Sequence, residues 1–467
     1  MLFASAGFLF AFLPLFMLAF ISVPKRFKYV VVLVGSIAFY VLSNLFSPFS
    51  ILVLWLTVLF HYFAGLLLQR RRDRFLLVLF VIVDLVALLS LRLLCNQTAE
   101  QYYFVFPVGA SLYLLMGISY LIEHYRDPDL RADDLTQTAL YLTFFPVMLA
   151  GPLIRFRDFT EQCKQLSFHM GDFARGASFF TVGLVKSMVA AVLVEAYDNI
   201  LQNSNLQVNF GIAFLSLVMM YLIVFFSFSG YSDMGVGLCV MIGMPMQRDY
   251  RNPLKATSTM SYLRGFFISF SEFWQDYVGS LFEKLPFGTA RVRRFLSLAC
   301  YILAMTLWFR LDSAALIIAL PLILMVLLEE LTPVGRFMQR RVGKLIGWLL
   351  TFGVMVLYWT MQKLGSYAQL MEYLRNFKEV SGSYQSLYTY ATSIGFDFII
   401  VAAIALIILL PLSNTREALV RPMPAKVQPI VDVTVVLMLM AMLMLALIYF
   451  LPQFPQYAVN PYAYFVI

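Results

Sequence analysis

The sequence predicts an all-α protein with many membrane-spanning helices, and three observations support this. Of its 467 residues, 61% are hydrophobic and only 13% are charged, whereas soluble domains are about 45–50% apolar and about 25% charged. The mean hydropathy is +0.81. Apolar runs of roughly 20 residues, the length that crosses a bilayer as a helix, recur along the chain. An ordinary soluble enzyme, a disordered chain and a disulfide scaffold are therefore excluded.

The apolar runs predict one transmembrane domain over residues 1–467 with about twelve crossings. The first run, residues 8–23, is expected to be retained rather than cleaved, because no basic residue precedes it and no small-residue cleavage site follows it. The remaining spans are expected at residues 29–47, 51–69, 75–94, 103–122, 176–197, 209–228, 295–309, 313–330, 345–362, 398–412 and 430–451.

Three further segments do not fit a simple crossing. Residues 137–151 are too short to span the hydrocarbon core and contain Pro146, so we expect a re-entrant piece buried against other helices. Residues 231–245 form another short run that ends at a proline. Residues 258–283 mix aromatic and charged side chains, which predicts an amphipathic segment at the membrane interface or along a cavity.

The formal net charge of +8 indicates membrane orientation rather than a nucleic-acid partner. Basic residues gather in alternate loops, at 25–28 and 70–74, whereas the loops at 47–50 and 96–101 carry no Lys or Arg. Because basic loops stay in the cytoplasm, the N-terminus is expected outside, and twelve crossings place both termini there. The connector 336–344 is then cytoplasmic. The lipid bilayer is the first expected partner.

Cysteine and histidine are scarce. The four cysteines stand far apart without a C-x-x-C pair, so neither a metal site nor a disulfide framework is expected. His61 lies within an apolar run, where we expect a packed or hydrogen-bonded core residue, with a proton relay as the alternative. His124 and His169 are expected in solvated loops.

Asp84 also lies within an apolar run, and ionisable groups inside membrane segments are functional candidates. Arg92 follows two turns later on the same expected helix, which is too far for a direct pair. The alternative is a buried, hydrogen-bonded acid that ties helices together.

The richest polar stretch begins at Phe226 and reads F-S-F-S-G-Y-S-D-M-G. Ser229 and Asp233 are four residues apart, so they share one face of a helix. Small residues here are also explained by helix packing alone. It is not a nucleophile elbow, because the spacing is G-x-S-x-x-G rather than G-x-S-x-G. Three glycines allow close backbone approach or a broken helix: Gly230, Gly235 and Gly237.

Five blocks of sequence stand in a recognisable order. They are M-L-F with F-L-P over residues 1–14, F-P-V-G-A-S-L-Y with I-S-Y-L and Y-R over 106–126, F-F-P with A-G-P-L-I-R over 144–155, F-S-G-Y-S-D-M over 228–234, and N-P-Y-A-Y-F over 460–465. Together they resemble the membrane-bound O-acyltransferase (MBOAT) family, in its bacterial alginate O-acetylase-like branch. The resemblance covers nearly the whole chain.

The resemblance implies a helical fold around a membrane tunnel and the transfer of an acyl group to a hydroxyl acceptor. It implies no bound cofactor, and an acyl donor such as acetyl-CoA. In this branch the acceptor pathway ends in O-acetylation of an exported polysaccharide at the bacterial inner membrane. The partners it implies are proteins of polysaccharide synthesis and export, together with periplasmic acetylation proteins.

The sequence departs from the family at its two histidines. One belongs to a W-R-R-W-H-I-S-L-S block, where this chain has Phe267, and the other to an L-W-H-G block, where it has Phe309. Ser227 replaces the acid that opens the family's D-F-S-G-Y block. A hydroxyl acceptor needs a base within hydrogen-bond reach, and phenylalanine carries no titratable group. We therefore expect no histidine-dependent acyl transfer, and no intact family catalytic residue.

The candidate site combines what remains of these motifs. Tyr231 and Asp233 are the candidates for a substitute acid or base, if burial shifts their pKa. We expect one polar cavity closed by aromatic side chains, because lipid-exposed polar groups are unfavourable. Arg310 and Asp312 are expected to form a surface ion pair in a short turn. Ser229, Tyr231, Ser232, Asp233 and Arg264 are expected to line the polar cavity, and Phe267, Trp308 and Phe309 to close it. The expected tunnel or substrate-lining residues are Ser227, Ser229, Ser232, Arg264, Trp308 and Arg155.

Three functions remain open from the sequence. The first is a catalytically degenerate membrane subunit of polysaccharide O-acetylation or export. The second is an active acyltransferase with a non-histidine mechanism. The third is a passage for a lipid or acyl carrier that uses a tunnel without chemistry. A neighbouring gene for a relative with both histidines favours the first function, whereas a neighbouring synthase with only a periplasmic acyltransferase favours the others.

Overall fold

The structure is a computed structural model, and it describes residues 2–45, 47–98, 106–127, 130, 134–202, 209–251, 253–311, 314–338, 340–364, 371 and 375. Within these residues the chain is all helical, which confirms the predicted fold class. The expected spans at 398–412 and 430–451, the C-terminal block at 460–465 and Asp312 lie outside the described residues.

Eight described helices are long and apolar enough to cross a membrane: Lys25–Ser43, Pro48–Arg71, Arg74–Leu94, Met170–Asp198, Phe210–Met241, Ala290–Phe309, Ala314–Leu331 and Gly343–Lys363. The first apolar run forms a shorter apolar helix, Phe8–Ser22. These helices agree with a polytopic membrane protein. The count of twelve crossings and the sidedness of the loops stay predictions.

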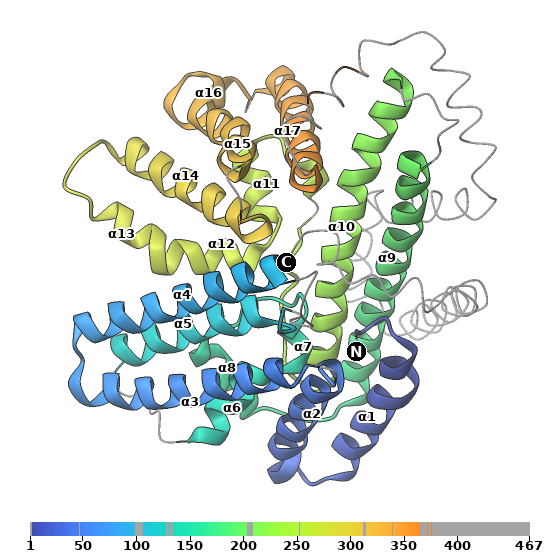
Figure 1. The fold of residues 1–467 in the computed structure, drawn as a ribbon, viewed down its shortest axis with the longest axis vertical. Helices are drawn as coiled ribbons and strands as arrows, with labels where there is room; N and C mark the ends of the chain where they lie inside the picture. Colours follow the sequence, from blue (N-terminus) through green and yellow to red (C-terminus); the bar gives the residue numbers. More distant parts are fainter. Residues whose placement is uncertain are drawn as a thin grey trace, which may run out of the picture.

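The N-terminal part consists of helices joined by short loops (Figure 1). The expected span at 103–122 is corrected, because its helix begins only at Ala110, after the left-handed Gly109, and is not among the candidate spans. The helices are α1 (Leu13–Ser22), α2 (Lys28–Ser43), α3 (Pro48–Arg71), α4 (Arg74–Thr98) and α5 (Ala110–Arg126).

The short apolar segment at 137–151 divides into two pieces, α6 (Leu135–Thr143) and α7 (Phe145–Met148), followed by α8 (Phe156–Cys163). The break falls at Phe144, because Pro146 at the start of α7 has no N–H to continue the helix. Residues 138–152 are all buried. The segment therefore packs inside the protein, as expected for a re-entrant piece.

Helices α9 (Met170–Gln202) and α10 (Phe210–Met241) form a long antiparallel pair. Their backbones touch at two places: a Cβ added to Gly183 would lie 2.4 Å from the Gly230 carbonyl oxygen, and one added to Gly176 would lie 2.5 Å from that of Gly237. Gly230 and Gly237 therefore allow the backbones of α9 and α10 to approach closely, which was one of the two expectations for them. The expectation of a broken helix is wrong, since α10 runs unbroken and joins the expected span at 209–228 to most of the run at 231–245.

The C-terminal part begins with the expected amphipathic segment, which the structure breaks between residues 265 and 268. A π-helical turn, Gln275–Gly279, follows the second short helix. The elements are α11 (Thr259–Gly265), α12 (Ile268–Trp274), α13 (Ser280–Glu283), α14 (Ala290–Phe309), α15 (Ala314–Leu331), α16 (Val334–Met338) and α17 (Arg341–Lys363).

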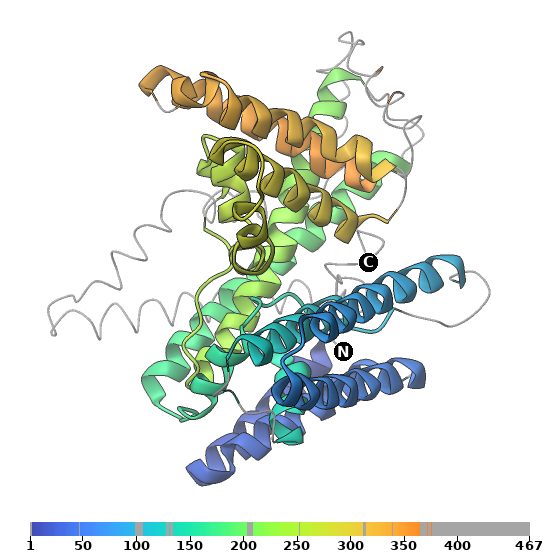
Figure 2. The same cartoon turned by 90° about the vertical axis from the view of Figure 1, so that its left-hand side faces the viewer.

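Helix α10 connects two hydrophobic cores. Its first part, from Ile212 to Phe228, packs in one core with α12, α14, α15 and α17. Its second part, from Tyr231 to Met241, packs in the other core with α1, α2 and α6 to α9. Figures 1 and 2 both show α9 and α10 running from the N-terminal helices to the C-terminal ones. The polar stretch after Phe226 therefore lies where the two cores meet.

Candidate active site

Two phenylalanines from distant segments meet in a buried space. Phe267 directly precedes α12 and Phe309 ends α14, and their ring centroids are 6.1 Å apart. Phe228 of α10 lies edge-on to both rings, at 5.3 and 5.5 Å. The enclosed volume is about 30 Å³, which holds about one or two water molecules. We call it the aromatic cavity, and its lining includes Phe228, Asp249, Phe267, Ser269, Trp308 and Phe309.

Asp249 is the one ionisable side chain among the described residues that line the aromatic cavity. It lies in the connection between α10 and α11 and is 3% exposed. The Ser269 backbone N–H donates to its Oδ1 at 2.5 Å. Burial raises the pKa of the Asp249 carboxyl to about 6, although the hydrogen bonds from Ser269 oppose this shift. A buried acid with a shifted pKa in a cavity is a candidate functional group.

Phe267 has a left-handed backbone, with φ of 55°. For a bulky side chain this conformation is unfavourable, by about 1–3 kcal/mol. Two hydrogen bonds across the loop hold it: the Ile268 N–H donates to the Asp249 carbonyl at 2.9 Å, and the Arg251 N–H donates to the Gly265 carbonyl at 2.8 Å. The kink separates α11 from α12 and directs the Phe267 ring to Phe309.

The polar stretch on α10 faces two different neighbours. Phe228 lines the aromatic cavity, whereas Asp233, about 140° further around the helix, faces α9. There it forms an ion pair with Lys186 at 2.7 Å and a longer one with Arg248 at 3.4 Å. Asp233 therefore holds α9 and α10 together and is not among the residues that line the aromatic cavity.

The expectation of one shared polar cavity is therefore corrected. The structure brings together Phe267, Trp308 and Phe309, as predicted. The polar candidates Ser227, Ser229, Tyr231 and Ser232 are buried on α10 but do not line that cavity. Tyr231 instead stacks on Phe3, with ring centroids 6.2 Å apart, and Arg264 is exposed. The reason is helical geometry, because consecutive residues of a helix point in different directions.

A second, larger space lies beside Arg155. Its volume is about 610 Å³, and we call it the charged cavity, lined by Glu123, Arg126, Asp127, Arg155, Arg157, Asp158, Asp276 and Tyr277. Arg155 pairs with Asp276 and Arg157 pairs with Asp127. These pairs link α8 to the π-helical turn and to α5. Arg155 is thus a cavity-lining residue, as predicted, but of this cavity.

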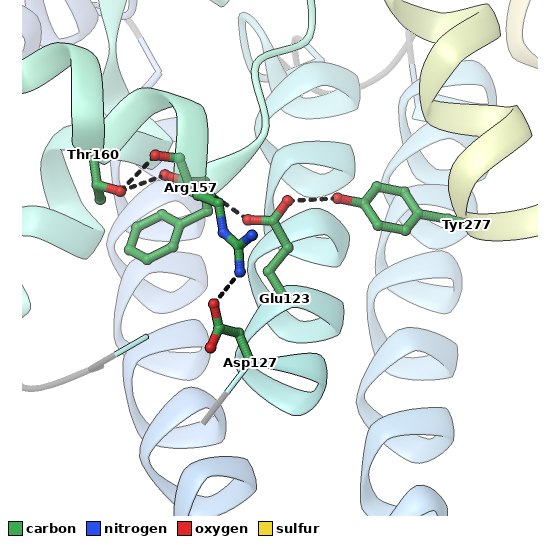
Figure 3. Close-up of polar contacts among 6 residues, drawn as sticks. Glu123, Asp127, Arg157, Thr160 and Tyr277 are labelled. Atoms are coloured by element: carbon green, nitrogen blue, oxygen red, sulfur yellow. Dashed lines mark hydrogen bonds and ion pairs between the residues drawn. The ribbon is translucent and has the colours of Figure 1, made fainter. Parts of the chain in front are cut away.

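Glu123 is a partly buried carboxyl of the charged cavity, hydrogen-bonded by residues of two other segments (Figure 3). It accepts hydrogen bonds from the Arg157 backbone N–H at 2.8 Å and from the Tyr277 hydroxyl at 2.9 Å. The Tyr277 hydroxyl also lies 2.8 Å from Ser119 Oγ, which is buried one turn earlier on α5. Burial raises the pKa of the Glu123 carboxyl above its usual value, although the bonds from Arg157 and Tyr277 lower it.

The same three segments line both cavities. On α5, Leu112 lines the aromatic cavity and Glu123 the charged one, about 16 Å apart along the helix axis. In the segment before α8, Gly151 lines the aromatic cavity and Arg155 lines the charged one. Phe270 of α12 lines the aromatic cavity, and Asp276 of the following turn lines the charged one. The two spaces therefore lie at different heights along the same three segments.

Asp84 and His61 form a buried pair in the membrane segments, with His61 Nε2 3.1 Å from Asp84 Oδ2. His61 Nδ1 lies 2.8 Å from the Thr57 carbonyl, so Nδ1 carries a proton that it donates there. One further proton between Nε2 and Oδ2 then gives a neutral pair. His61 and Asp84 are therefore buried, hydrogen-bonded residues of the protein core, as one of the two expectations for each had it. Arg92 does not pair with Asp84 and donates instead to the Leu307 carbonyl at 2.9 Å.

Burial and contacts test two other expectations, those for His124 and His169, whereas the ion pair of Arg310 with Asp312 stays a prediction. His124 is fully buried in α5, with Nδ1 2.8 Å from the Tyr120 carbonyl, so the solvated reading is wrong. The apolar residues around it are contributed by α8, which sequence periodicity did not reveal. His169 is exposed, as expected. Arg310 donates to the Gln362 and Leu364 carbonyls and so caps the end of α17.

The fold and the aromatic cavity define an all-helical membrane protein with an enclosed site between its helices. Comparison with known proteins refines this: residues 111–297 match the sequence model of MBOAT, the membrane-bound O-acyltransferase family. The matched segment, which is similar to this family, includes Phe228, Asp249 and Phe267.

Individual relatives agree with this match. The chain is 30% identical over 300 residues to a probable alginate O-acetylase AlgI of Pseudomonas aeruginosa, covering 60% of this chain and 56% of the relative. It is 22% identical over 343 residues to a peptidoglycan O-acetyltransferase of Helicobacter pylori, covering 63% of each. It is 23% identical over 182 residues to a teichoic acid D-alanyltransferase of Bacillus subtilis, covering 36% of this chain and 45% of the relative. The chain thus spans less than two thirds of the length of these relatives.

Proposed function

We propose that this chain is a membrane subunit in the O-acylation of a cell-surface polysaccharide. The observation that carries the proposal is the aromatic cavity, where two positions that the family resemblance assigns to histidine meet, Phe267 within the matched segment and Phe309 shortly after it. The named relatives act on alginate, peptidoglycan and teichoic acid, which are all cell-surface polymers. A polytopic helical protein in the bacterial inner membrane suits the transfer of an acyl group to such a polymer.

The donor in this proposal is an acyl thioester such as acetyl-CoA, which is made in the cytoplasm. The charged cavity is lined by three arginines and four carboxyls, and two of the arginines are ion-paired, so its charge alone does not favour an anionic donor. Proteins of polysaccharide export and periplasmic acetylation are the partners in this proposal.

We propose further that histidine takes no part in the transfer. Phe267 and Phe309 fill the two positions, and a cavity of about 30 Å³ leaves no room for an acyl group beside them. The small volume of the aromatic cavity supports a subunit that lacks the histidine-dependent catalysis of the family. Neither Tyr231 nor Asp233 lines the cavity, so neither is placed to replace the histidines there. The alternative function, an active acyltransferase with a non-histidine mechanism, needs another acid–base group in the cavity. The presence of Asp249 in the cavity lining favours this alternative.

Deletion and complementation of the gene test the proposed function. We expect deletion to abolish the O-acyl groups of the exported polymer, measured by chemical release and by NMR, and the full-length gene to restore them. The Gly171→Ala variant, whose added Cβ meets no atom within 4 Å, is the matched control. Unchanged O-acylation after deletion would falsify the proposal. Loss of polymer export together with acylation would favour the passage function instead.

A further inference from the structure

The aromatic cavity keeps one group that can take a proton. Its described lining is otherwise aromatic, aliphatic or hydroxyl-bearing, and only Asp249 titrates. The carboxyl reaches the cavity from the loop after α10, and it faces the space between Phe228, Phe267 and Phe309. It therefore lies beside both positions that the resemblance assigns to histidine.

The position of this carboxyl is well defined. Its Oδ1 is fixed by the Ser269 N–H at 2.5 Å, and its own backbone carbonyl is fixed by the Ile268 N–H at 2.9 Å. Ser269 is in turn held by the Leu153 N–H, which donates to Ser269 Oγ at 2.8 Å. Two segments, the start of α12 and the residues before α8, thus orient the group, as acid–base chemistry requires.

We propose that Asp249 is the general acid–base residue of acyl transfer in the aromatic cavity. The inference rests on the proposed function and assigns to a carboxylate the role that the resemblance gives to histidine. Asp249 is then a catalytic residue, and the chain is an acyltransferase that works without histidine.

The step balances with an acyl thioester as donor and a sugar hydroxyl as acceptor. The Asp249 carboxylate takes the hydroxyl proton while the hydroxyl oxygen forms a bond to the acyl carbonyl carbon. The bond between that carbon and the thioester sulfur then breaks. The protonated Asp249 returns its proton to the leaving thiolate, so the products are an O-acyl ester and a free thiol, with Asp249 again ionised.

The surroundings of Asp249 suit this role. With a pKa of about 6, the carboxyl is mostly ionised at pH 7 and still basic enough to accept a proton. The ionisable groups that act on it are Glu272 of α12, whose charge raises the pKa, and Tyr301 of α14. The reacting groups can meet beside Asp249 only when the ring of Phe267 or Phe309 turns aside, because the closed cavity is too small for them.

The test compares Asp249→Asn with wild type in the deletion strain. Asparagine keeps an oxygen that can accept the Ser269 N–H, so the variant is expected to insert normally. We expect polymer O-acylation to fall about 10²–10⁴-fold, the usual contribution of acid–base catalysis. Glu161→Gln, which removes an exposed carboxylate on α8, is the charge-matched control and is expected to act like wild type. Full O-acylation by Asp249→Asn at normal protein level overturns the inference.

A pH profile separates catalysis from a structural role. In membrane vesicles that carry the full chain, transfer from acetyl-labelled acetyl-CoA to polymer should rise about tenfold per pH unit below pH 6 and level off above it. Asp249→Glu should keep a sigmoidal profile with a shifted midpoint. A wild-type profile that is flat from pH 5 to 7 overturns the inference. Failure of the proposed function can be distinguished from failure of the Asp249 inference, because in the former case deletion of the gene leaves O-acylation unchanged.

Discussion

The ring of Phe267 lies 6.1 Å from the ring of Phe309, although Phe267 precedes α12 and Phe309 is the last residue of α14. The fold therefore brings these two positions together whatever side chains they carry. What remains ionisable there is the carboxyl of Asp249.

The contact between α9 and α10 predicts that Gly183→Ala destabilises the protein. The new Cβ would lie 2.4 Å from the Gly230 carbonyl oxygen, a backbone atom that cannot move alone. We expect a loss of about 1–3 kcal/mol in unfolding free energy. The matched control is Gly171→Ala on the same helix, where nothing lies within 4 Å and alanine is the better helix former. Thermal unfolding in detergent checks both, and equal midpoints would contradict the close approach.

The buried pair of His61 and Asp84 predicts a sharp difference between two substitutions. Asp84→Ala leaves His61 Nε2 without its partner, which costs about 1–3 kcal/mol for an unsatisfied buried group. Asp84→Asn can donate an amide N–H to a neutral His61 and should cost less. Denaturant unfolding of the two variants measures the difference. Equal losses would show that the pair does not stabilise the contact between α3 and α4.

The ion pair between Asp233 and Lys186 predicts that a second substitution restores the stability lost when Asp233 is replaced. Asp233→Ala removes the carboxylate that pairs with the mostly buried ammonium of Lys186, and removing one partner of a buried pair costs about 3–5 kcal/mol. Asp233→Ala with Lys186→Met removes both charges and should restore most of the stability and the inserted amount. Immunoblotting of membranes and thermal unfolding follow this recovery. If Asp233 were instead an acid or base of the reaction, the double variant would fold and still lack activity.

The burial of Asp249 predicts that stability depends on pH. Its folded pKa, about 6, exceeds the usual value of 3.8, so the folded state holds the proton more tightly. This contribution to stability is complete below about pH 4 and is lost as the pH rises through 6, a change of about 3 kcal/mol. Asp249→Asn should therefore unfold at a higher temperature than wild type at pH 7.5, with a smaller gap at pH 5. A constant gap across this range would contradict the buried carboxyl.

Hydrophobic patterning predicted most of the described helices because the lipid and the core both select long apolar runs. It divided α10 wrongly, since Gly230, Gly235 and Pro245 resemble a helix end in a single sequence. The structure shows why the helix continues there. A second helix, α9, packs glycine against glycine, and only tertiary contact could reveal this.

The candidate site was predicted in part. Phe267, Trp308 and Phe309 were placed together through family motifs, and the structure agrees. Asp249 was missed because it stands between Arg248 and Arg251 in a loop, where a charged residue normally faces water. Its burial depends on the kink at Phe267, which returns the chain over the loop. The polar side chains of α10 were grouped by sequence nearness, although a helix directs them to different neighbours.

The main chain at Phe267 has a bearing on which side chain suits this position. Asn, Asp and His are enriched several-fold among left-handed residues, and a bulky phenylalanine is an outlier there. The backbone with φ of 55° thus suits a histidine, which the family resemblance leads us to expect here, better than it suits phenylalanine. An engineer who wants to give the cavity a new activity can therefore leave the loop as it is and vary only the side chains that project from it.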